Sequence, residues 1–232
     1  RVTRIGGQAN AYTTLDHTCY YISAASGKTG ECIDLVADWL ARPKFTEEDF
    51  EREHGVVQRE LEKGKDEAGR QAWYAHAQNV FGTHPAAVPV IGYAEPLSEV
   101  TWEDIRAYHA RMYVPQNMIF VIVGDINVEE SLLRARKAFA GFEAGRRPDL
   151  SLPEVRPFTG VRTVAREHKD MKDVSVSMSF QSIPLLHEDL YALDVLGNVL
   201  AAGRSSLLYR EIFRKRKLVT SISCSSWTPQ WG

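Results

Sequence analysis

Residues 46–63, TEEDFEREHGVVQRELEK, combine a helix start with two acidic residues on a partly apolar helix face. Thr46 is followed three residues later by Asp49, which is a capping-box pattern and predicts that a helix begins here. At about 100° per residue, the apolar side chains Phe50, Val57 and Leu61 share one stripe, and most of the charged side chains lie opposite. The segment therefore predicts an amphipathic helix that packs against the rest of the protein.

Glu53 and Glu60 fall within about 20° of each other on this helix, in the angular gap between Val56 and Val57. Their carboxylates are therefore expected to point toward the margin of the core. An unpaired carboxylate in such a place costs several kcal/mol, so each needs a cation, a hydrogen-bond donor or a metal ion. The spacing alone leaves two interpretations open: ion pairs with Arg or Lys of a neighbouring element, or the binding and support of a metal.

The composition is that of an ordinary globular protein, with 232 residues, 44% hydrophobic and 25% charged, and a net charge of −2. The near-neutral charge argues against a general nucleic-acid binder, which normally has a strong basic excess. The longest apolar run, Met118–Val123, is far too short to span a bilayer. Three widely spaced cysteines predict no disulfide framework.

The order strand, helix, helix, strand occurs on both sides of a proline-rich stretch and predicts an α+β fold built from two related units. Strand-like segments are 7–25, 117–126, 174–180 and 218–226, and helical segments are 29–42, 46–63, a stretch around 73–80, 101–112, 129–140, 187–200 and 204–216. The run 117–126 is continuously apolar, as in a strand buried on both faces. Residues 147–160 are proline-rich and form the predicted linker between domains at 1–146 and 161–232.

The two ends of the sequence suggest a piece of a longer protein. The chain begins at Arg1 without an initiator Met or a signal peptide, and strand-like patterns lie close to both ends. We therefore expect both predicted domains to be truncated.

Several short motifs resemble, in the same order, those of the M16 metallopeptidases, the insulinase, pitrilysin and mitochondrial-processing-peptidase family. They are Gly6-Gly-Gln-Ala-Asn10-Ala11-Tyr-Thr13, Thr18-Cys-Tyr-Tyr21, Phe50–Glu60, His84-Pro85, Gly92, Thr101-Trp-Glu-Asp104, Tyr113-x-Pro115-x-Asn117-Met118 and Val123-Gly-Asp125. Beyond the linker, Gly203–Tyr209 and Leu218 resemble the opening half of the family's second homologous domain. The resemblance covers nearly the whole chain and implies an M16-like α+β fold, in which a mixed sheet is covered by helices.

The resemblance implies a zinc peptidase that hydrolyses peptide bonds with metal-activated water. Glu60 matches the family's later zinc ligand, and Glu53 matches the acidic residue of the catalytic site that supports this ligand. Three protein ligands leave one zinc position open for water, whose pKa falls toward about 7. Asn10 and Ala11 match an edge strand that holds an extended peptide by strand addition. Taken without the resemblance, Asn10 is equally well explained as a turn residue after a glycine pair.

The sequence departs from the family in two places. The motif His-x-x-Glu-His, which supplies the other zinc ligands and the acid that activates water, is absent, and family spacing places it about fifteen to twenty residues before Arg1. One carboxylate cannot hold zinc alone, so this chain by itself is expected to be neither a zinc binder nor a peptidase. Phe213 and Thr220 stand where complete members have an Arg and a Tyr that bind substrate. A second M16-type domain or subunit is therefore expected to complete the site.

Two alternatives to a peptidase stay open at this point. One is a non-catalytic M16-like subunit that binds partners or scaffolds a complex. The other is an unrelated α+β binding module in which Glu53 and Glu60 pair with Arg side chains. For the peptidase, the expected partner is a peptide or protein substrate, with no nucleic acid and no membrane span.

Three further side chains have ordinary explanations. Trp73 is expected in the core, with a substrate side-chain pocket as the alternative. His54 is expected to make a hydrogen bond in the core, and His109 to take a surface or hydrogen-bonded core position.

Overall fold

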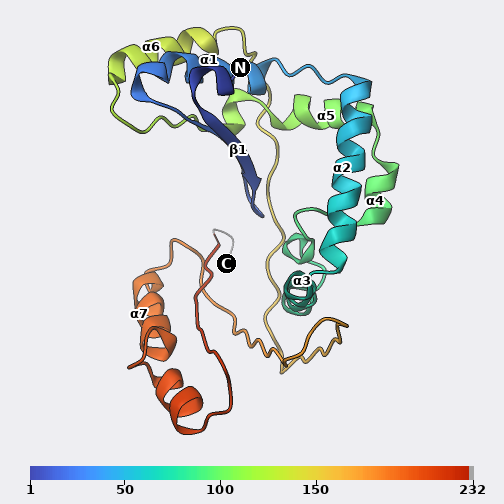
Figure 1. Ribbon diagram of the computed structural model, residues 1–232, viewed down its shortest axis with the longest axis vertical. Coiled ribbons are helices and arrows are strands. Elements are labelled where there is room, and N and C mark those ends of the chain that lie inside the picture. Colours follow the sequence, from blue (N-terminus) through green and yellow to red (C-terminus); the bar gives the residue numbers. More distant parts are fainter. Residues whose placement is uncertain (230–232) are drawn as a thin grey trace. The chain divides into compact units, whose positions relative to one another are not determined.

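The computed structural model describes residues 1–229, which divide into two compact units (Figure 1). Unit 1 contains Arg1–Tyr74 and Val88–Ser151, and unit 2 contains Ala75–Ala87 and the chain from Leu152 onward. Within the described residues the secondary structure is mostly helical, with one small antiparallel sheet. The α+β class is the one that the sequence predicts, but the described residues contain a two-stranded antiparallel sheet where a mixed sheet was expected.

The sheet is a hairpin of β1 (Gln8–Thr13) and β2 (Thr18–Ser23) in unit 1. Its turn is closed by the backbone N–H of Thr14, which donates to the carbonyl of His17 at 2.8 Å. The strand material predicted over 7–25 is confirmed, because β-branched and aromatic residues favour strands and the turn is local.

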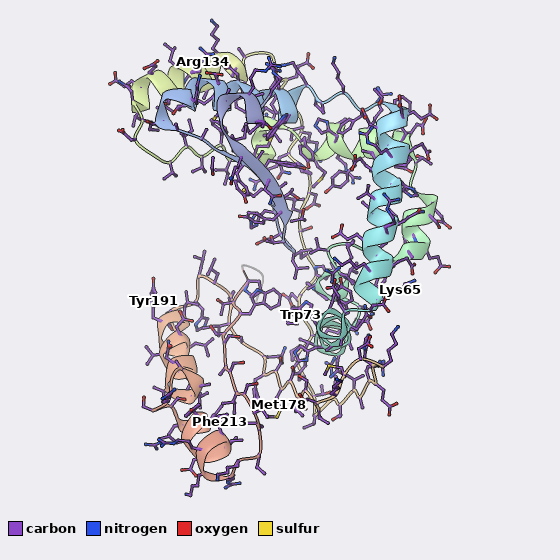
Figure 2. The ribbon with its side chains drawn as sticks, in the orientation of Figure 1. Lys65, Trp73, Arg134, Met178, Tyr191 and Phe213 are labelled. Carbon is purple, nitrogen blue, oxygen red and sulfur yellow. The ribbon has the colours of Figure 1, made fainter. Side chains whose placement is uncertain are left out.

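The core of unit 1 lies along α1 (Thr29–Ala41), which packs against α6 (Val128–Ala138) (Figure 1). The buried side chains of α1 are Ile33, Leu35, Val36, Ala37 and Leu40. The sequence predicts Cys32, Leu35, Val36, Trp39 and Leu40 as the apolar face of this helix; Leu35, Val36 and Leu40 are buried, whereas Cys32 and Trp39 are half-buried and Ile33 and Ala37 are buried in their place. At the exposed margin of this contact, the guanidinium of Arg134 (labelled in Figure 2) forms an ion pair with the carboxylate of Asp34 in α1.

α2 (Glu47–Lys65) begins at the predicted position, because the side-chain oxygen of Thr46 accepts a hydrogen bond from the backbone N–H of Asp49 at 3.1 Å. Lys65 is at its C-terminal end (Figure 2). α3 (Ala68–Phe81) follows after a short break. Both helices are therefore confirmed.

α5 (Trp102–Met112) carries the capping box predicted from the sequence. The side chain of Thr101 accepts from the backbone N–H of Asp104 at 3.2 Å, and the carboxylate of Asp104 accepts from the backbone N–H of Thr101 at 2.9 Å. The indole N–H of Trp102 donates to the carbonyl of Phe45 at 2.8 Å, which ties the start of α5 to the segment before α2.

The remaining helices are short or lie in unit 2. They are α4 (Ala94–Glu99), α7 (Leu190–Ala201), the π-helix η5 (Tyr209–Lys215), and the 3₁₀ turns η1 (Thr3–Ile5), η2 (Ser26–Lys28), η3 (Pro85–Ala87) and η4 (Pro115–Asn117). α7 and η5 confirm helices predicted at 187–200 and 204–216, although the second is wound as a π-helix that carries Phe213 (Figure 2). The rings of Tyr209 and Phe213 are stacked, with centroids 4.7 Å apart. Among residues 1–229, no helix has both the length and the apolar character needed to cross a membrane.

In unit 2, His84 is buried, with 6% of its surface exposed. Its Nε2 donates to the carbonyl of Pro153 at 3.0 Å, and its Nδ1 accepts from the backbone N–H of Ala86 at 3.1 Å. Nearby in the same unit, the rings of Phe81 and Trp227 meet edge to face, with centroids 5.6 Å apart. Both ring nitrogens of His84 are thus satisfied within the fold.

Three predicted strands do not form in the described part of the chain. The segments 117–126, 174–180 and 218–226 have no strand pairing there. The expected burial of 117–126 on both faces is also wrong, since Ile119 is 92% exposed and Val123 is 90% exposed. A strand needs a second strand to satisfy its backbone N–H and C=O groups, and only the hairpin finds its partner within a few residues.

Candidate functional site

Glu53 and Glu60 both lie on the exposed surface of α2. The side chain of Glu53 is 64% exposed and forms a 3.2 Å ion pair with Arg52 of the same helix. Such an exposed pair contributes little to stability. Within the described residues, neither carboxylate pairs with a cation from another element. The expectation that both point toward the core margin is therefore wrong for this structure.

The reason is that α2 is covered on a different side. α4 packs against α2 (Figure 1), and the Nε2 of His54 donates to the carbonyl of Leu97 in α4 at 2.9 Å. The hydrogen bond expected for His54 is thereby confirmed. His54 lies about 100° around the helix from Glu53, so the face of Glu53 and Glu60 lies to the side of the contact with α4. No described element buries this face.

The described residues do not complete a metal site. Among residues 1–229, no three His, Cys, Asp or Glu side chains are grouped so that they could hold a metal ion. The carboxylates of Glu53 and Glu60 have the right chemistry for zinc, but a zinc site needs three or four protein ligands. The part of the chain that the structure describes therefore does not fit zinc on its own.

The main chain of Ala11 faces the open edge of β1, whereas that of Asn10 faces β2. Thr14 and His17 form a hydrogen-bonded pair at the turn, and such pairs alternate with non-hydrogen-bonded ones along an antiparallel ladder. Counting back from the turn, Ala11 and Tyr20 form a non-hydrogen-bonded pair, so the N–H and C=O of Ala11 point away from β2. Within residues 1–229, no further strand covers that edge.

Asn10 occupies this open edge with its own side chain. Its Oδ1 accepts a hydrogen bond from the N–H of Ala11 at 2.8 Å. Asn10 lies inside β1 and pairs with Tyr21, so it is a strand residue and not a turn residue. Asn10 and Ala11 belong to the same unit as Glu53 and Glu60, but no hydrogen bond or ion pair among the described residues joins the two pairs.

A row of aromatic side chains, missed in the sequence analysis, connects the hairpin to the helices of unit 1. The hydroxyls of Tyr20 in β2 and Tyr113 lie 2.6 Å apart. The ring of Tyr113 stacks on His109 of α5, with centroids 4.6 Å apart, and the Nε2 of His109 donates to the carbonyl of Leu40 in α1 at 3.0 Å. His109 thus takes the hydrogen-bonded position expected as one alternative. The only signal in the sequence was the spacing of His109 and Tyr113, four residues apart at a helix end.

Burial shifts the ionisation of both rings. The pKa of the Tyr113 hydroxyl is raised well above its usual value, first by burial and then by the hydrogen bond with Tyr20. The pKa of His109 is lowered by burial, although the hydrogen bond to the Leu40 carbonyl acts in the opposite direction. The row therefore carries a neutral phenol and, at neutral pH, a neutral imidazole.

Protonation of His109 should lower the stability of the protein in mild acid. Its folded pKa lies below the unfolded value of about 6.5, so its contribution to stability is present above about pH 6.5 and is lost as the pH falls through the folded pKa. We expect the free energy of urea unfolding to fall less between about pH 7 and pH 5 in His109→Gln, which keeps an N–H donor but does not titrate there. Equal declines in the two proteins would contradict this assignment.

Trp73 and the two substituted positions, Phe213 and Thr220, have the following places in their own units. Trp73 on α3 is 55% exposed (Figure 2), so its expected place in the core is wrong; among the described residues of α3 only Ala77 is buried. Phe213 is stacked within η5, and Thr220 is exposed in a segment without regular structure. Both lie in unit 2.

Comparison with known proteins identifies the family. The insulinase family, peptidase family M16, matches residues 1–91, and the peptidase M16 inactive domain matches residues 99–229. An uncharacterized zinc protease of Mycobacterium tuberculosis is 29% identical over 219 residues, which cover 94% of this chain and 50% of that protein. The zinc protease PqqE of Helicobacter pylori is 28% identical over 223 residues, which cover 94% of this chain and 50% of that protein.

Solved structures agree with the sequence relatives. The crystal structure of a protease from Helicobacter pylori superposes with a TM-score of 0.83 at 25% identity, covering 99% of this chain and 56% of that one. A peptidase M16 inactive domain from Pseudomonas fluorescens has the same fold, with a TM-score of 0.78 at 20% identity, covering 98% of this chain and 55% of that one. The chain spans about half the length of the curated relatives it matches. With one family match covering more than half of its residues, the chain belongs to the M16 peptidase family.

Proposed function

We propose that this chain is part of a zinc-dependent metallopeptidase that hydrolyses peptide bonds, and that Glu60 binds the metal in the complete protein. The observation that carries the proposal is the pair of carboxylates, Glu53 and Glu60, on one exposed face of α2, inside the region that matches the insulinase family. Relatives named zinc proteases support it. A zinc ion bound at such a site polarises the peptide carbonyl and lowers the pKa of a bound water.

Glu53 has a supporting role in this proposal. It lies two helical turns before Glu60 on the same face, so its carboxylate can accept hydrogen bonds from a ligand or a water near Glu60. Its contact with Arg52 is exposed and weak, and therefore leaves the carboxylate available. The ligands that Glu60 lacks would come from the family's His-x-x-Glu-His segment, packed on the face that no described element buries.

The open edge of β1 is the proposed peptide-binding strand. The outward N–H and C=O of Ala11, and those of Ala9 and Thr13 two residues to either side, are spaced to bond an added extended peptide. The Oδ1 of Asn10 accepts the hydrogen bond of the Ala11 N–H in this structure. A peptide carbonyl that binds this N–H would therefore displace the Asn10 Oδ1. The displaced amide of Asn10 would then be free to bond the peptide itself.

A second M16-type domain or subunit is proposed to complete the substrate site. Phe213 and Thr220 cannot supply the positive charge and the phenol that complete members use there. The relatives are about twice as long as this chain, which is consistent with further domains in the complete protein.

A second candidate function is a non-catalytic M16 subunit that binds partners. The observation that favours it is the match of residues 99–229 to a domain described as inactive. Such a subunit would keep the fold and the open edge of β1 but would have no functional metal site.

One comparison separates the two functions. This chain alone should bind no zinc tightly and cleave no peptide, whereas a longer form with about forty residues ahead of Arg1, including the His-x-x-Glu-His segment, should bind one zinc and cleave an extended peptide. Zinc content and cleavage of a fluorogenic peptide are measured on both proteins, with a chelator as control. If the longer form folds but binds no zinc, the peptidase proposal fails and the subunit proposal takes its place.

A further inference from the structure

The hairpin lacks backbone hydrogen bonds at the position where the proposed peptide would bind. Ala11 and Tyr20 form a non-hydrogen-bonded pair, so their main-chain groups point outward on both sides. Directly opposite residues of an antiparallel pair project their side chains on the same face. The small side chain of Ala11 therefore lies beside the phenol of Tyr20, and at this level side-chain contacts can add to the backbone hydrogen bonds of the flanking pairs.

The phenol of Tyr20 is tied to a residue 93 positions away, since its hydroxyl lies 2.6 Å from that of Tyr113. Tyr113 is itself well anchored at the end of α5. Its backbone N–H donates to the carbonyl of His109 at 2.8 Å, and its ring stacks on the His109 imidazole. His109 in turn bonds the carbonyl of Leu40, a core residue of α1. The hydroxyl of Tyr113 is thus presented to β2 from the core helices of unit 1.

We propose that the hydroxyl pair of Tyr20 and Tyr113 positions the hairpin so that the outward main chain of Ala11 is held ready for an extended peptide. Tyr113 is then a positioning residue that acts on the peptide through Tyr20 and Ala11. The peptide part of this inference rests on the proposed function. The physical reason is preorganisation, because a strand that is already ordered loses less conformational entropy when a peptide adds to its edge.

The geometry also gives a reason for a small residue at position 11. A larger side chain there would crowd the Tyr20 phenol, since directly opposite side chains in a non-hydrogen-bonded pair are especially close. Tyr20 would have to turn, and its hydroxyl would leave that of Tyr113.

Amide hydrogen exchange, measured on this chain, tests whether the two hydroxyls position the hairpin. It needs no assay of peptide cleavage. In Tyr20→Phe and in Tyr113→Phe, the ladder amides of Asn10 and Tyr12 should exchange roughly 2- to 12-fold faster, the equivalent of one net hydrogen bond. The double variant should exchange no faster than either single variant, because both remove the same bond. Amides in the interior of α6 should not change.

Tyr21→Phe is the matched control. Tyr21 is the next residue of β2, its side chain is on the opposite face, and its hydroxyl makes no hydrogen bond among the described residues. Exchange in Tyr21→Phe should equal that of the wild type. If Tyr113→Phe behaves like Tyr21→Phe, or if the two single effects add in the double variant, the positioning role is overturned.

Peptide kinetics in the longer form of the protein test the part of the proposal that concerns peptide binding. Tyr113→Phe should raise KM by the same factor as the change in exchange and leave kcat unchanged, because the hydroxyl pair touches neither the metal ligands nor the reacting atoms. A fall in kcat with unchanged KM would overturn the inference. If the wild-type longer form cleaves no peptide, the proposed function fails, while the exchange experiment still decides whether the two tyrosines position the hairpin.

Discussion

Glu60→Gln, made in a longer form of the protein that carries the His-x-x-Glu-His segment, should abolish stoichiometric zinc binding and lower peptide cleavage by at least about 100-fold. Changing a residue that only orients a metal ligand lowers metal affinity or activity by about 10- to 100-fold, and changing the ligand itself should lower them further. Gln has nearly the shape of Glu but carries no charge, and its amide is a poor zinc ligand. Because Glu60 is exposed on α2, the change should leave the fold intact.

Two other glutamates of α2 provide the comparison. Glu62 lies about 200° around the helix from Glu60 and pairs with Lys65 at 2.6 Å, so Glu62→Gln should retain zinc and activity. Glu53→Gln should retain zinc but lose about 10- to 100-fold in cleavage rate, as expected for a supporting acid. Zinc content is measured by atomic absorption after gel filtration. Cleavage is measured as the rate at which a fluorogenic peptide is hydrolysed. A Glu60→Gln protein with full zinc content would show that Glu60 is not a ligand.

Ile33→Ala should lower the free energy of unfolding by about 2–5 kcal/mol, more than any other substitution proposed for this protein. Ile33 is 2% exposed on α1, the helix that packs against α6, so truncation leaves a cavity in the core of unit 1. Urea unfolding followed by circular dichroism gives the difference.

Leu133→Ala is the matched control for this prediction. Leu133 belongs to α6 and is 71% exposed, so its truncation should change the free energy of unfolding by less than about 0.5 kcal/mol. Equal effects of the two substitutions would mean that the contact of α1 with α6 is not the core of the unit.

Features that depend on nearby residues were predictable from the sequence. The starts of α2 and α5 follow from Thr46 and Thr101, whose side chains cap backbone groups three residues away. The hairpin of β1 and β2 needs only a short turn between its strands. The strands expected at 117–126 and 174–180 instead need partners far along the chain, and sequence periodicity does not reveal whether a partner is there.

The candidate site shows the same limit. The helical angle of Glu53 and Glu60 was correctly derived, but an angle does not say which element covers that face; α4 covers the side of His54. The roles of Glu60, Glu53, Asn10 and Ala11 came from the family resemblance and stay predictions. The contact of Tyr20 with Tyr113 spans 93 residues, and no local pattern indicated it.

The proposed function depends on the carboxylate of Glu60 as a zinc ligand in the complete protein. The most direct measurement is anomalous X-ray scattering at the zinc edge from crystals of the longer form. We expect a single strong peak at about 2.0–2.2 Å from a carboxylate oxygen of Glu60, with two histidine nitrogens at about 2.0–2.1 Å from the metal. A zinc peak bound elsewhere, with the Glu60 side chain still in solvent, would contradict it.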